Sequence, residues 1–339
     1  MAVTTTEQRC VRALNDALID VFERREDVYL LGEDVLDPYG GTFKVTEGLS
    51  TRWPARVLTT PISEAGLFGV AAGMALRGYR PILEIMFGDF ITLGFDQIVN
   101  GIGKFREMFD DQVRVPLVVR TPMGGGRGYG PTHSQSLEKL LLGVPGITVV
   151  AANECHDLTL LVREAVADDD PVFLIEHKLM YGRPNRRPVD GYVGGLQCVE
   201  TASRYPALSF SGNGFRGAAA TIATYGGMLP VALDAAVELL LEDEIFVEVV
   251  ALGQLLPLEL DPVLDSVART GRLITLEEGT LTAGIGAEIA ARVQSEAWGS
   301  LHGPVHRIAA PDTAIPAAAT LESSVLPGVR DVVATVRAL

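Results

Sequence analysis

The sequence predicts an α/β protein of two domains, each built on a sheet with helices on both faces. Three observations predict this class. The chain has 339 residues, about the length of two average domains. Hydrophobic residues make up 47% of it and charged residues 21%, as is usual for chains that fold around a packed core. Short β-branched runs alternate with amphipathic stretches, which is typical of parallel sheets covered by helices.

The first half of the chain shows this alternation most clearly. Apolar residues recur at helical spacing over Thr6–Arg24, so a helix is expected there. The expected strands are Val28–Leu31, Val57–Thr59, Pro81–Ile85, Pro116–Arg120, Thr148–Ala151 and Val172–Ile175. The expected helices between them are Glu64–Arg77, Phe95–Phe109 and Asp157–Ala167. We therefore predict a first domain with a parallel sheet over residues 1–182.

The pattern changes at residue 182, where the chain reads GRPNRRPVDGYVGG. Proline, glycine and charge in such density are typical of a linker, and we predict one over residues 183–217. A second α/β domain is expected over residues 218–339. Its predicted strands are Ala220–Thr224, Val247–Ala251 and Arg272–Glu277, and its predicted helices are Leu229–Leu241 and Gly286–Ser295.

Composition argues against several classes of protein. A net charge of −15 disfavours binding to nucleic acid or to anionic membranes, because a polyanion would be repelled. The three cysteines have no CxxC spacing and no neighbouring histidines, so neither a disulfide framework nor a zinc site is expected. The first residues do not resemble a signal peptide, and no apolar run reaches the roughly 18 residues of a membrane span. We expect a soluble, cytoplasmic protein.

Three segments of the first domain carry residues that are suited to chemistry. In TTPISEAGLFGVAAGMALRG, residues 59–78, Glu64 stands at the start of an expected helix. The helix dipole favours a carboxylate there, so a purely structural role is one interpretation of Glu64. The small residues that follow, such as Gly69 and Gly73, would let this helix pack closely against another backbone.

The other two segments begin where expected strands end, which is where open α/β sheets bind ligands. Phe87, after the third strand, could stack on a heterocycle or pack in the core. His133 lies in the glycine-rich loop of residues 120–140, as a candidate acid, base or hydrogen-bond donor. A lone loop histidine more often has a structural role, and that alternative stays open. The loop matches neither a phosphate-binding P-loop nor a dinucleotide fingerprint.

Taken together, these segments resemble the β subunit of the first component of 2-oxo acid dehydrogenases. This family uses thiamine diphosphate and includes pyruvate, branched-chain and acetoin dehydrogenases. The matching blocks run in order along nearly the whole chain: LLGEDV, YGGTFKVTEGL, TTPISEAG, FGDF, FDQIVN, HSQSLE, DDPVFLIEHKLMY, TYGGML, LPLEL and EEGTLTAGIGAEIAA. The resemblance implies a transketolase-like pyrimidine-binding domain, a transketolase C-terminal-type domain, and decarboxylation of a 2-oxo acid with acyl transfer to a lipoyl-type carrier.

The resemblance also assigns roles to four residues. Glu64 would contact N1′ of the cofactor's aminopyrimidine and promote its imino form, which can remove the proton from thiazolium C2. Phe87 would pack against the aminopyrimidine, and Ile62, in the same ISE motif as Glu64, would be a further cofactor-binding residue. His133 would face the substrate and the lipoyl group, so Glu64 and His133 are the expected catalytic residues. No metal ligand is expected from this chain.

The absence of one motif bears on the partners that the resemblance implies. Thiamine enzymes hold Mg²⁺ and diphosphate through a GDG motif and a downstream asparagine, and Gly88-Asp89-Phe90 is only a partial match. The resemblance therefore implies an α subunit that supplies this half of the site in an α₂β₂ heterotetramer. A dihydrolipoyl acyltransferase, or a related acyl carrier, is the second implied partner. A structural potassium ion near residue 115 and residues 148–170 is also compatible with the family.

Two departures from the family pattern leave the substrate open. The motif before the Pro-Leu pair has Gly253 or Gln254 where an arginine is common, and the segment Gln197–Gly217 is longer than usual. Either could mark an enzyme of specialised biosynthesis rather than of central metabolism, with a different acyl donor and acceptor.

Two other functions compete with this interpretation. The GPTH sequence at residues 130–133 is similar to transketolase and deoxyxylulose-phosphate synthase, which transfer ketol groups. The SQSLE and EHKLMY blocks favour the dehydrogenase family instead. A non-catalytic scaffold subunit is the other alternative, and the joint presence of Glu64, Phe87 and His133 argues against it.

Overall fold

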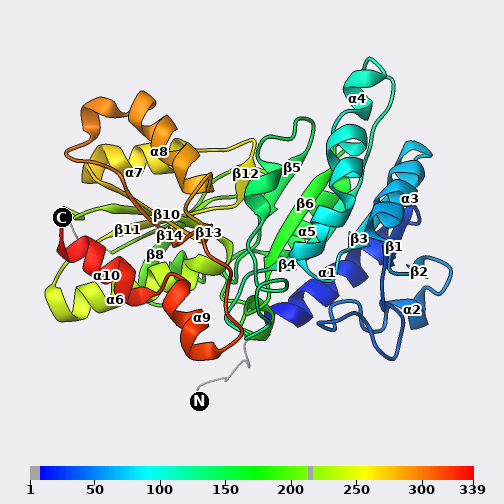
Figure 1. The fold of residues 1–339 in the computed structure, drawn as a ribbon, viewed down its shortest axis with the longest axis horizontal. Helices are drawn as coiled ribbons and strands as arrows, with labels where there is room; N and C mark the ends of the chain where they lie inside the picture. The colour runs from blue at the N-terminus through cyan, green and yellow to red at the C-terminus, as the bar shows by residue number, and fades with distance from the viewer. Residues whose placement is uncertain (1–7, 213–216) are drawn as a thin grey trace. The chain divides into compact units, whose positions relative to one another are not determined.

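The computed structural model describes residues 8–212 and 217–339. The chain divides into two compact units. Unit 1 comprises Met1–Pro122 and Gly143–Arg187, and unit 2 comprises Met123–Leu142 and Pro188–Leu339. Each unit is an α/β structure (Figure 1), so the predicted fold class is confirmed. Within the described residues, no helix is both long and apolar enough to cross a membrane.

The strands of unit 1 form a parallel sheet in the order β5-β6-β4-β3-β1-β2. Their bounds are Val28–Gly32 (β1), Val57–Thr59 (β2), Arg80–Glu84 (β3), Val118–Met123 (β4), Thr148–Ala151 (β5) and Val172–His177 (β6). Strands β4 and β6 are buried at every position, because both faces of a parallel sheet are covered. This explains why their apolar residues are adjacent in sequence rather than alternating with polar ones.

The helices of unit 1 include three long ones. They are Cys10–Arg24 (α1), Glu64–Leu76 (α3) and Leu158–Ala167 (α5), with the single turns Leu49–Arg52 (α2) and Phe105–Met108 (α4). Helix α1 packs against α5 (Figure 1), and Asp157 caps α5 by accepting a 3.0 Å hydrogen bond from the Leu160 N–H. Thr6, at the start of the predicted first helix, lies outside the described residues.

The prediction of one helix over Phe95–Phe109 was wrong. The chain there forms a 3₁₀-helical segment at Gly88–Gly94, a π-helical turn at Gln97–Ile102 and then α4. Glycines explain the irregularity, since they weaken helices and allow close packing. A Cβ on Gly94 would lie 2.2 Å from the Phe68 ring, so this segment approaches α3 more closely than a regular helix with side chains could.

The sheet of unit 2 has the order β14-β13-β10-β11-β9-β8-β7. Its parallel part consists of Thr221–Tyr225 (β10), Glu248–Leu252 (β11), Leu273–Thr280 (β13) and His306–Ala310 (β14). Helices α6 (Leu229–Asp243) and α10 (Val329–Arg337) lie on one face, and α7 (Asp261–Thr270) and α8 (Ile285–Glu296) on the other (Figure 1). The unit also contains the short helix α9 (Ala319–Val325) and strand β12 (Gln254–Leu256).

The stretch predicted as a linker has regular structure in its described part. Strands β7 (Tyr192–Val193), β8 (Leu196–Glu200) and β9 (Leu208–Ser211) form the antiparallel edge of the unit 2 sheet. Their inward side chains, such as Cys198 and Phe210, are buried, which is the alternation expected of a strand with one covered face. Residues 213–216 lie outside the described part, and the predicted domain boundaries at 182 and 218 stay predictions.

Candidate functional site

Glu64 is the first residue of α3, which begins at the carboxyl edge of the unit 1 sheet. Strand β2 ends at Thr59, and a short turn brings the chain back over the sheet. Only 6% of Glu64 is exposed, and burial of an acid is costly unless its environment compensates. The helix N-terminus contributes favourably to a negative charge here. The side chain is therefore held inside the unit at a position where a simple surface cap would be exposed.

A second buried carboxyl, Glu33, accompanies Glu64. It follows β1, the neighbour of β2, and is 5% exposed. Burial raises the pKa of Glu33, and the nearby Glu64 charge raises it further, while a hydrogen bond from the Ser63 backbone N–H lowers it. Glu33 Oε1 has no hydrogen-bond partner. Two adjacent strand ends thus bring together two acids, one of which retains its proton to a higher pH than an exposed glutamate.

Phe87 lies beyond the end of β3 within a row of aromatic rings. Its centroid is 5.7 Å from that of Phe43 and 5.8 Å from that of Phe90. Phe43 in turn lies 5.1 Å from the ring of Tyr181. The Nζ of Lys178, a fully buried residue, is 5.5 Å from the centre of the Phe87 ring, within the range of a cation–π interaction. Phe87 is thereby fixed in orientation while remaining partly exposed.

A buried ionic cluster holds the far end of this row. The Tyr181 hydroxyl donates a 2.5 Å hydrogen bond to Glu176. Glu176 also accepts from the Arg120 guanidinium at 2.7 and 2.8 Å, and Arg120 donates to Glu84 at 2.9 Å. Burial raises the pKa of Glu84, and Arg120 opposes that rise. Strands β3, β4 and β6 are thus connected by charged groups beneath the aromatic row.

These supporting residues were missed by the sequence analysis, although a signal existed. Glu84, Arg120 and Glu176 each follow a run of apolar residues in a predicted strand, and a charge inside a buried strand requires a partner. Which charges pair depends on strand order, which the sequence alone does not fix. Glu33 carries no comparable signal, because it follows a strand in an ordinary Gly-Glu-Asp turn.

Ile62 lies two residues before Glu64 and is 82% exposed. An apolar side chain at this exposure makes little contact with its own unit, so it is available to a ligand or to another chain. The exposed face of α3 continues this surface through Gly66, Gly69, Val70 and Gly73.

His133 belongs to unit 2, in the loop that follows β4. Its side chain is partly exposed, and Nδ1 is 2.9 Å from the Thr132 hydroxyl. The next residue, Ser134, is fully buried, and its hydroxyl has no hydrogen-bond partner. An imidazole that is partly exposed is chemically suited to act as an acid, base or hydrogen-bond donor.

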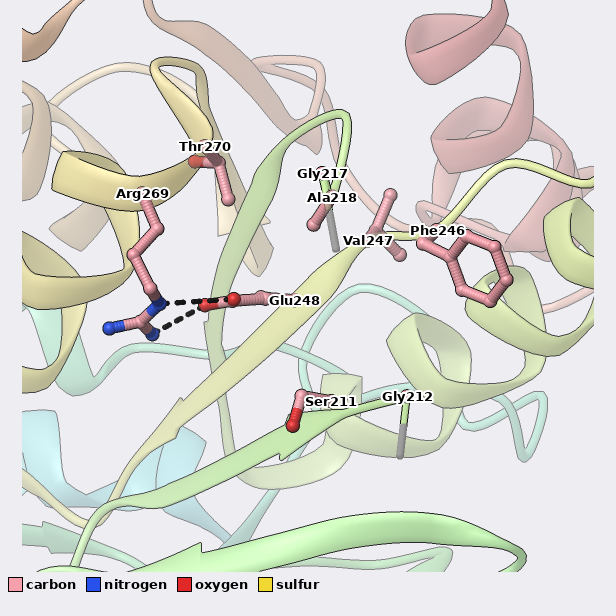
Figure 2. A pocket seen from close by; sticks show the side chains of 9 residues that line it. All are labelled: Ser211, Gly212, Gly217, Ala218, Phe246, Val247, Glu248, Arg269 and Thr270. Atoms are coloured by element: carbon pink, nitrogen blue, oxygen red, sulfur yellow. Dashed lines mark hydrogen bonds and ion pairs between the residues drawn. The ribbon is translucent and has the colours of Figure 1, made fainter. Parts of the chain in front are cut away.

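Figure 2 shows a separate cavity of unit 2, with a volume of about 240 Å³. Ser211, Glu248, Arg269 and Thr270 are among its lining residues, and Arg269 is paired with Glu248 at 2.6 Å. It lies at the amino ends of β10 and β11, whereas α/β sheets bind ligands at the carboxyl ends. None of the predicted site residues lines it.

The fold and the two carboxyl-edge acids define a transketolase-like chain. Residues 7–184 match the model of the transketolase pyrimidine-binding domain, and residues 216–332 match the transketolase C-terminal domain. A solved structure described as a split-gene transketolase, an inactive beta4 tetramer, superposes with a TM-score of 0.73 over 98% of both chains at 22% identity. At that identity the likeness shows the fold alone.

The named relatives identify the family within the transketolase-like proteins. The chain is 40% identical to the pyruvate dehydrogenase E1 component subunit beta of Leifsonia xyli, over 94% of this chain and 90% of that protein. It is 36% identical to the beta subunit of acetoin:2,6-dichlorophenolindophenol oxidoreductase of Cupriavidus necator, over 96% and 95%. The pyruvate dehydrogenase beta subunit of Rickettsia bellii matches at 37%, over 96% of both. The chain belongs to the β-subunit family of 2-oxo acid dehydrogenase first components, as its motifs predicted.

Proposed function

We propose that this chain is the β subunit of a thiamine-diphosphate-dependent 2-oxo acid dehydrogenase. The complete enzyme would decarboxylate a 2-oxo acid and pass the acyl group to a lipoyl-type carrier. The observation that carries this proposal is the buried pair of Glu33 and Glu64 at the carboxyl edge of unit 1. Family membership supports it, because the relatives include both pyruvate and acetoin enzymes.

The residues present fit the aminopyrimidine end of thiamine diphosphate. Glu33 Oε1 is a buried acceptor without a partner, and such a group costs about 1–3 kcal/mol until a donor reaches it. An aminopyrimidine offers an amino donor and a ring-nitrogen acceptor, which two neighbouring carboxyls can satisfy when one of them is protonated. Phe87 and the exposed Ile62 offer apolar surface to a flat ring.

When bound, the cofactor supplies a carbon nucleophile that attacks the 2-oxo acid and stabilises the negative charge left by decarboxylation. In our proposal Glu64 holds a proton at the ring nitrogen N1′, and Glu33 keeps a proton available beside it. Burial and the Glu64 charge raise the pKa of Glu33, so Glu33 keeps its proton to a higher pH than an exposed glutamate does. Burial of both excludes water, which preserves the strength of these hydrogen bonds.

His133 is the second proposed catalytic residue. Its partly exposed imidazole could donate a hydrogen bond to the substrate carbonyl, and supply a proton when the acyl group moves to the lipoyl thiol. The contact of Nδ1 with the Thr132 hydroxyl helps to orient the ring.

The diphosphate end requires another chain. Among residues 8–212 and 217–339, no three acidic, histidine or cysteine side chains gather in a way that could hold a metal ion. We propose that an α subunit holds Mg²⁺ and the diphosphate in an α₂β₂ heterotetramer, and that a dihydrolipoyl acyltransferase or related carrier accepts the product. The relatives' description as beta subunits supports the first partner. A structural potassium ion stays a prediction.

Calorimetric titration with thiamine diphosphate and Mg²⁺ tests this proposal. The chain is titrated alone and after mixing with a candidate α subunit. We expect heat only from the mixture, and the mixture is then screened with different 2-oxo acids and an artificial oxidant. Tight binding by the chain alone would contradict the β-subunit assignment, because the chain would then anchor the diphosphate itself.

A further inference from the structure

The glycine-rich loop before His133 is bound by two carboxylates that come from much later in the chain. Glu322, on α9, accepts hydrogen bonds from the backbone N–H groups of Gly126 and Gly128, each at 2.9 Å. Glu278, in β13, accepts from the Gly125 N–H at 2.7 Å. All of these residues belong to unit 2.

The bond to Glu322 depends on the unusual backbone of the loop. Gly126 and Gly128 have φ values of +81° and +69°, a left-handed conformation that glycine adopts at no steric cost. This conformation turns two nearby N–H groups in the same direction, forming a small concavity that binds anions. The Glu322 carboxylate fills that concavity with one oxygen on each N–H, and such charge-assisted bonds are roughly twice as strong as neutral ones.

Glu278 binds the chain on both sides of His133 in the sequence. The same Glu278 oxygen that binds Gly125 also accepts from the Ser136 hydroxyl at 3.1 Å. The Gly124 N–H donates to the Gln135 carbonyl at 3.1 Å, which closes the base of the loop. Gly125 precedes His133 in the sequence and Ser136 follows it, and both are bound to Glu278 of β13. Glu322 holds the loop between Gly125 and His133.

Both carboxylates are buried, with 3% of Glu322 and 7% of Glu278 exposed. Loops of glycine are flexible by themselves, and a residue that must meet a substrate has to be held within a fraction of an ångström. We propose that Glu322 and Glu278 are positioning residues that set the conformation of the loop and, through it, the place of His133. The catalytic role of His133 in this inference rests on the proposed function. The part that concerns the conformation of the loop does not.

Trypsin offers a test that needs no activity. Arg127 lies between the two N–H groups bound by Glu322, and its side chain is exposed. In the folded full-length chain, Glu322→Gln should speed cleavage after Arg127 by roughly tenfold, because one charge-assisted acceptor is lost. The control is Glu288→Gln, which changes an exposed glutamate of the same unit and should leave the rate unchanged. Equal rates in the wild type and Glu322→Gln would overturn the inference.

Hydrogen exchange of the wild-type chain covers the case in which the variant does not fold. The Gly126 and Gly128 amides should be protected, since both donate to a buried carboxylate. Exchange at the rate of an exposed loop would overturn the inference without any mutant.

A double-mutant cycle in the complex with the α subunit separates this inference from the proposed function. Glu322→Gln should lower acyl transfer to lipoyl more than turnover of an artificial oxidant, and should add little to the loss caused by His133→Ala. Fully additive losses would overturn the positioning role. If His133→Ala itself retained full acyl transfer, the proposed role of His133 would fail, while the trypsin result would still decide whether Glu322 holds the loop.

Discussion

Glu33 and Glu64 form a buried pair that, in our proposal, matters more to chemistry than to folding. Both are buried, and the charge on Glu64 raises the pKa of Glu33. Removal of one charge relieves repulsion between them, so the fold does not need both acids in ionised form. A role for the proton, by contrast, requires a carboxyl that can give and take one.

We therefore predict that Glu64→Gln abolishes thiamine-dependent turnover without destabilising the chain. Activity of the complex should fall by roughly 10²–10⁴-fold, the usual contribution of a positioned acid or base. The unfolding free energy should not decrease, because glutamine keeps the size of the side chain and loses the repulsion. Turnover and urea denaturation are compared with those of Glu26→Gln, an exposed change in the same unit. Full turnover in Glu64→Gln would rule out the assigned role.

Among the helices and strands, most of the alternating elements of the parallel sheets were predicted from the sequence, whereas helix α7 and the antiparallel edge of unit 2 were missed. Strands β2 and β5 coincide with their predicted residues, and α3 differs from its prediction by one, because turn residues such as Pro61, Gly78 and Gly146 mark where these elements begin or end. Helix α7 was missed although Pro262 stands in its first turn and Gly271 directly follows its last residue, the usual order of these two residues in a helix. The antiparallel edge of unit 2 was missed because prolines and glycines in its connections outweighed three short strands.

Helix α3 is apolar on all sides, yet one face is exposed in this chain. Gly73 lies on that face, and a Cβ there would meet no atom within 4 Å. The fold of this chain therefore does not require glycine at 73. The family's β subunits work with a second chain, and glycine would let a partner backbone approach closely.

This arrangement predicts opposite effects of two glycine substitutions on the isolated chain. Gly73→Ala should raise the unfolding free energy by about 0.5–1 kcal/mol, because alanine is the better helix former. Gly78→Ala should lower it by about 1–2 kcal/mol, because residue 78 has φ +89°, where a Cβ is strained. Urea denaturation distinguishes the two. A loss of stability in Gly73→Ala would show that residue 73 is constrained within its own chain.

The ionic cluster of β3, β4 and β6 leads to a further prediction at this scale. Arg120→Met would leave Glu84 and Glu176 buried without their shared cation, and should lower the unfolding free energy by about 3–5 kcal/mol. Arg114→Met, at a side chain that is 42% exposed, is the control and should change it by less than about 0.5 kcal/mol. Thermal denaturation measures both. The cluster would be dispensable if the two variants melted together.

For the whole molecule, the buried acids and the net charge of −15 both lower the free energy of unfolding as the pH rises. Burial raises the pKa of Glu277 to about 7, and the Glu138 charge contributes to that rise. A folded-state pKa above the unfolded value means that the folded chain binds the proton more tightly. The stability from this proton is complete below about pH 4.5 and is lost as the pH rises to 7.

We predict that Glu277→Gln flattens the pH dependence of stability. Between pH 4.5 and 7, deprotonation of Glu277 should lower the unfolding free energy of the wild type by about 3 kcal/mol. Glutamine does not titrate, so the variant should not show this decrease. The free energy of unfolding is measured at pH 5, 6, 7 and 8 for both proteins, with Glu288→Gln as the exposed control. Parallel curves for wild type and Glu277→Gln would contradict the raised pKa.

The sequence identified candidate site residues by their motifs, and their roles stay predictions, but it did not identify the groups that support them. Glu64, Phe87 and His133 stand in recognisable motifs. The groups that hold them come from remote positions, such as Arg120 beneath the aromatic row and Glu322 beneath the glycine loop. Their contribution depends on which segments meet after folding, and a single sequence gives no measure of that proximity.

The bond between Gly126 and Glu322 also has a consequence for the order of events during synthesis. The two residues are 196 positions apart, which at usual ribosomal speeds of 5–20 residues per second separates their appearance by roughly 10–40 s. Throughout that interval the loop has been made but its anchor has not. A nascent chain therefore contains Glu33 and Glu64 long before Glu322 can bind the glycine-rich loop, and a polypeptide interrupted before α9 would lack the contacts of Glu322 with Gly126 and Gly128.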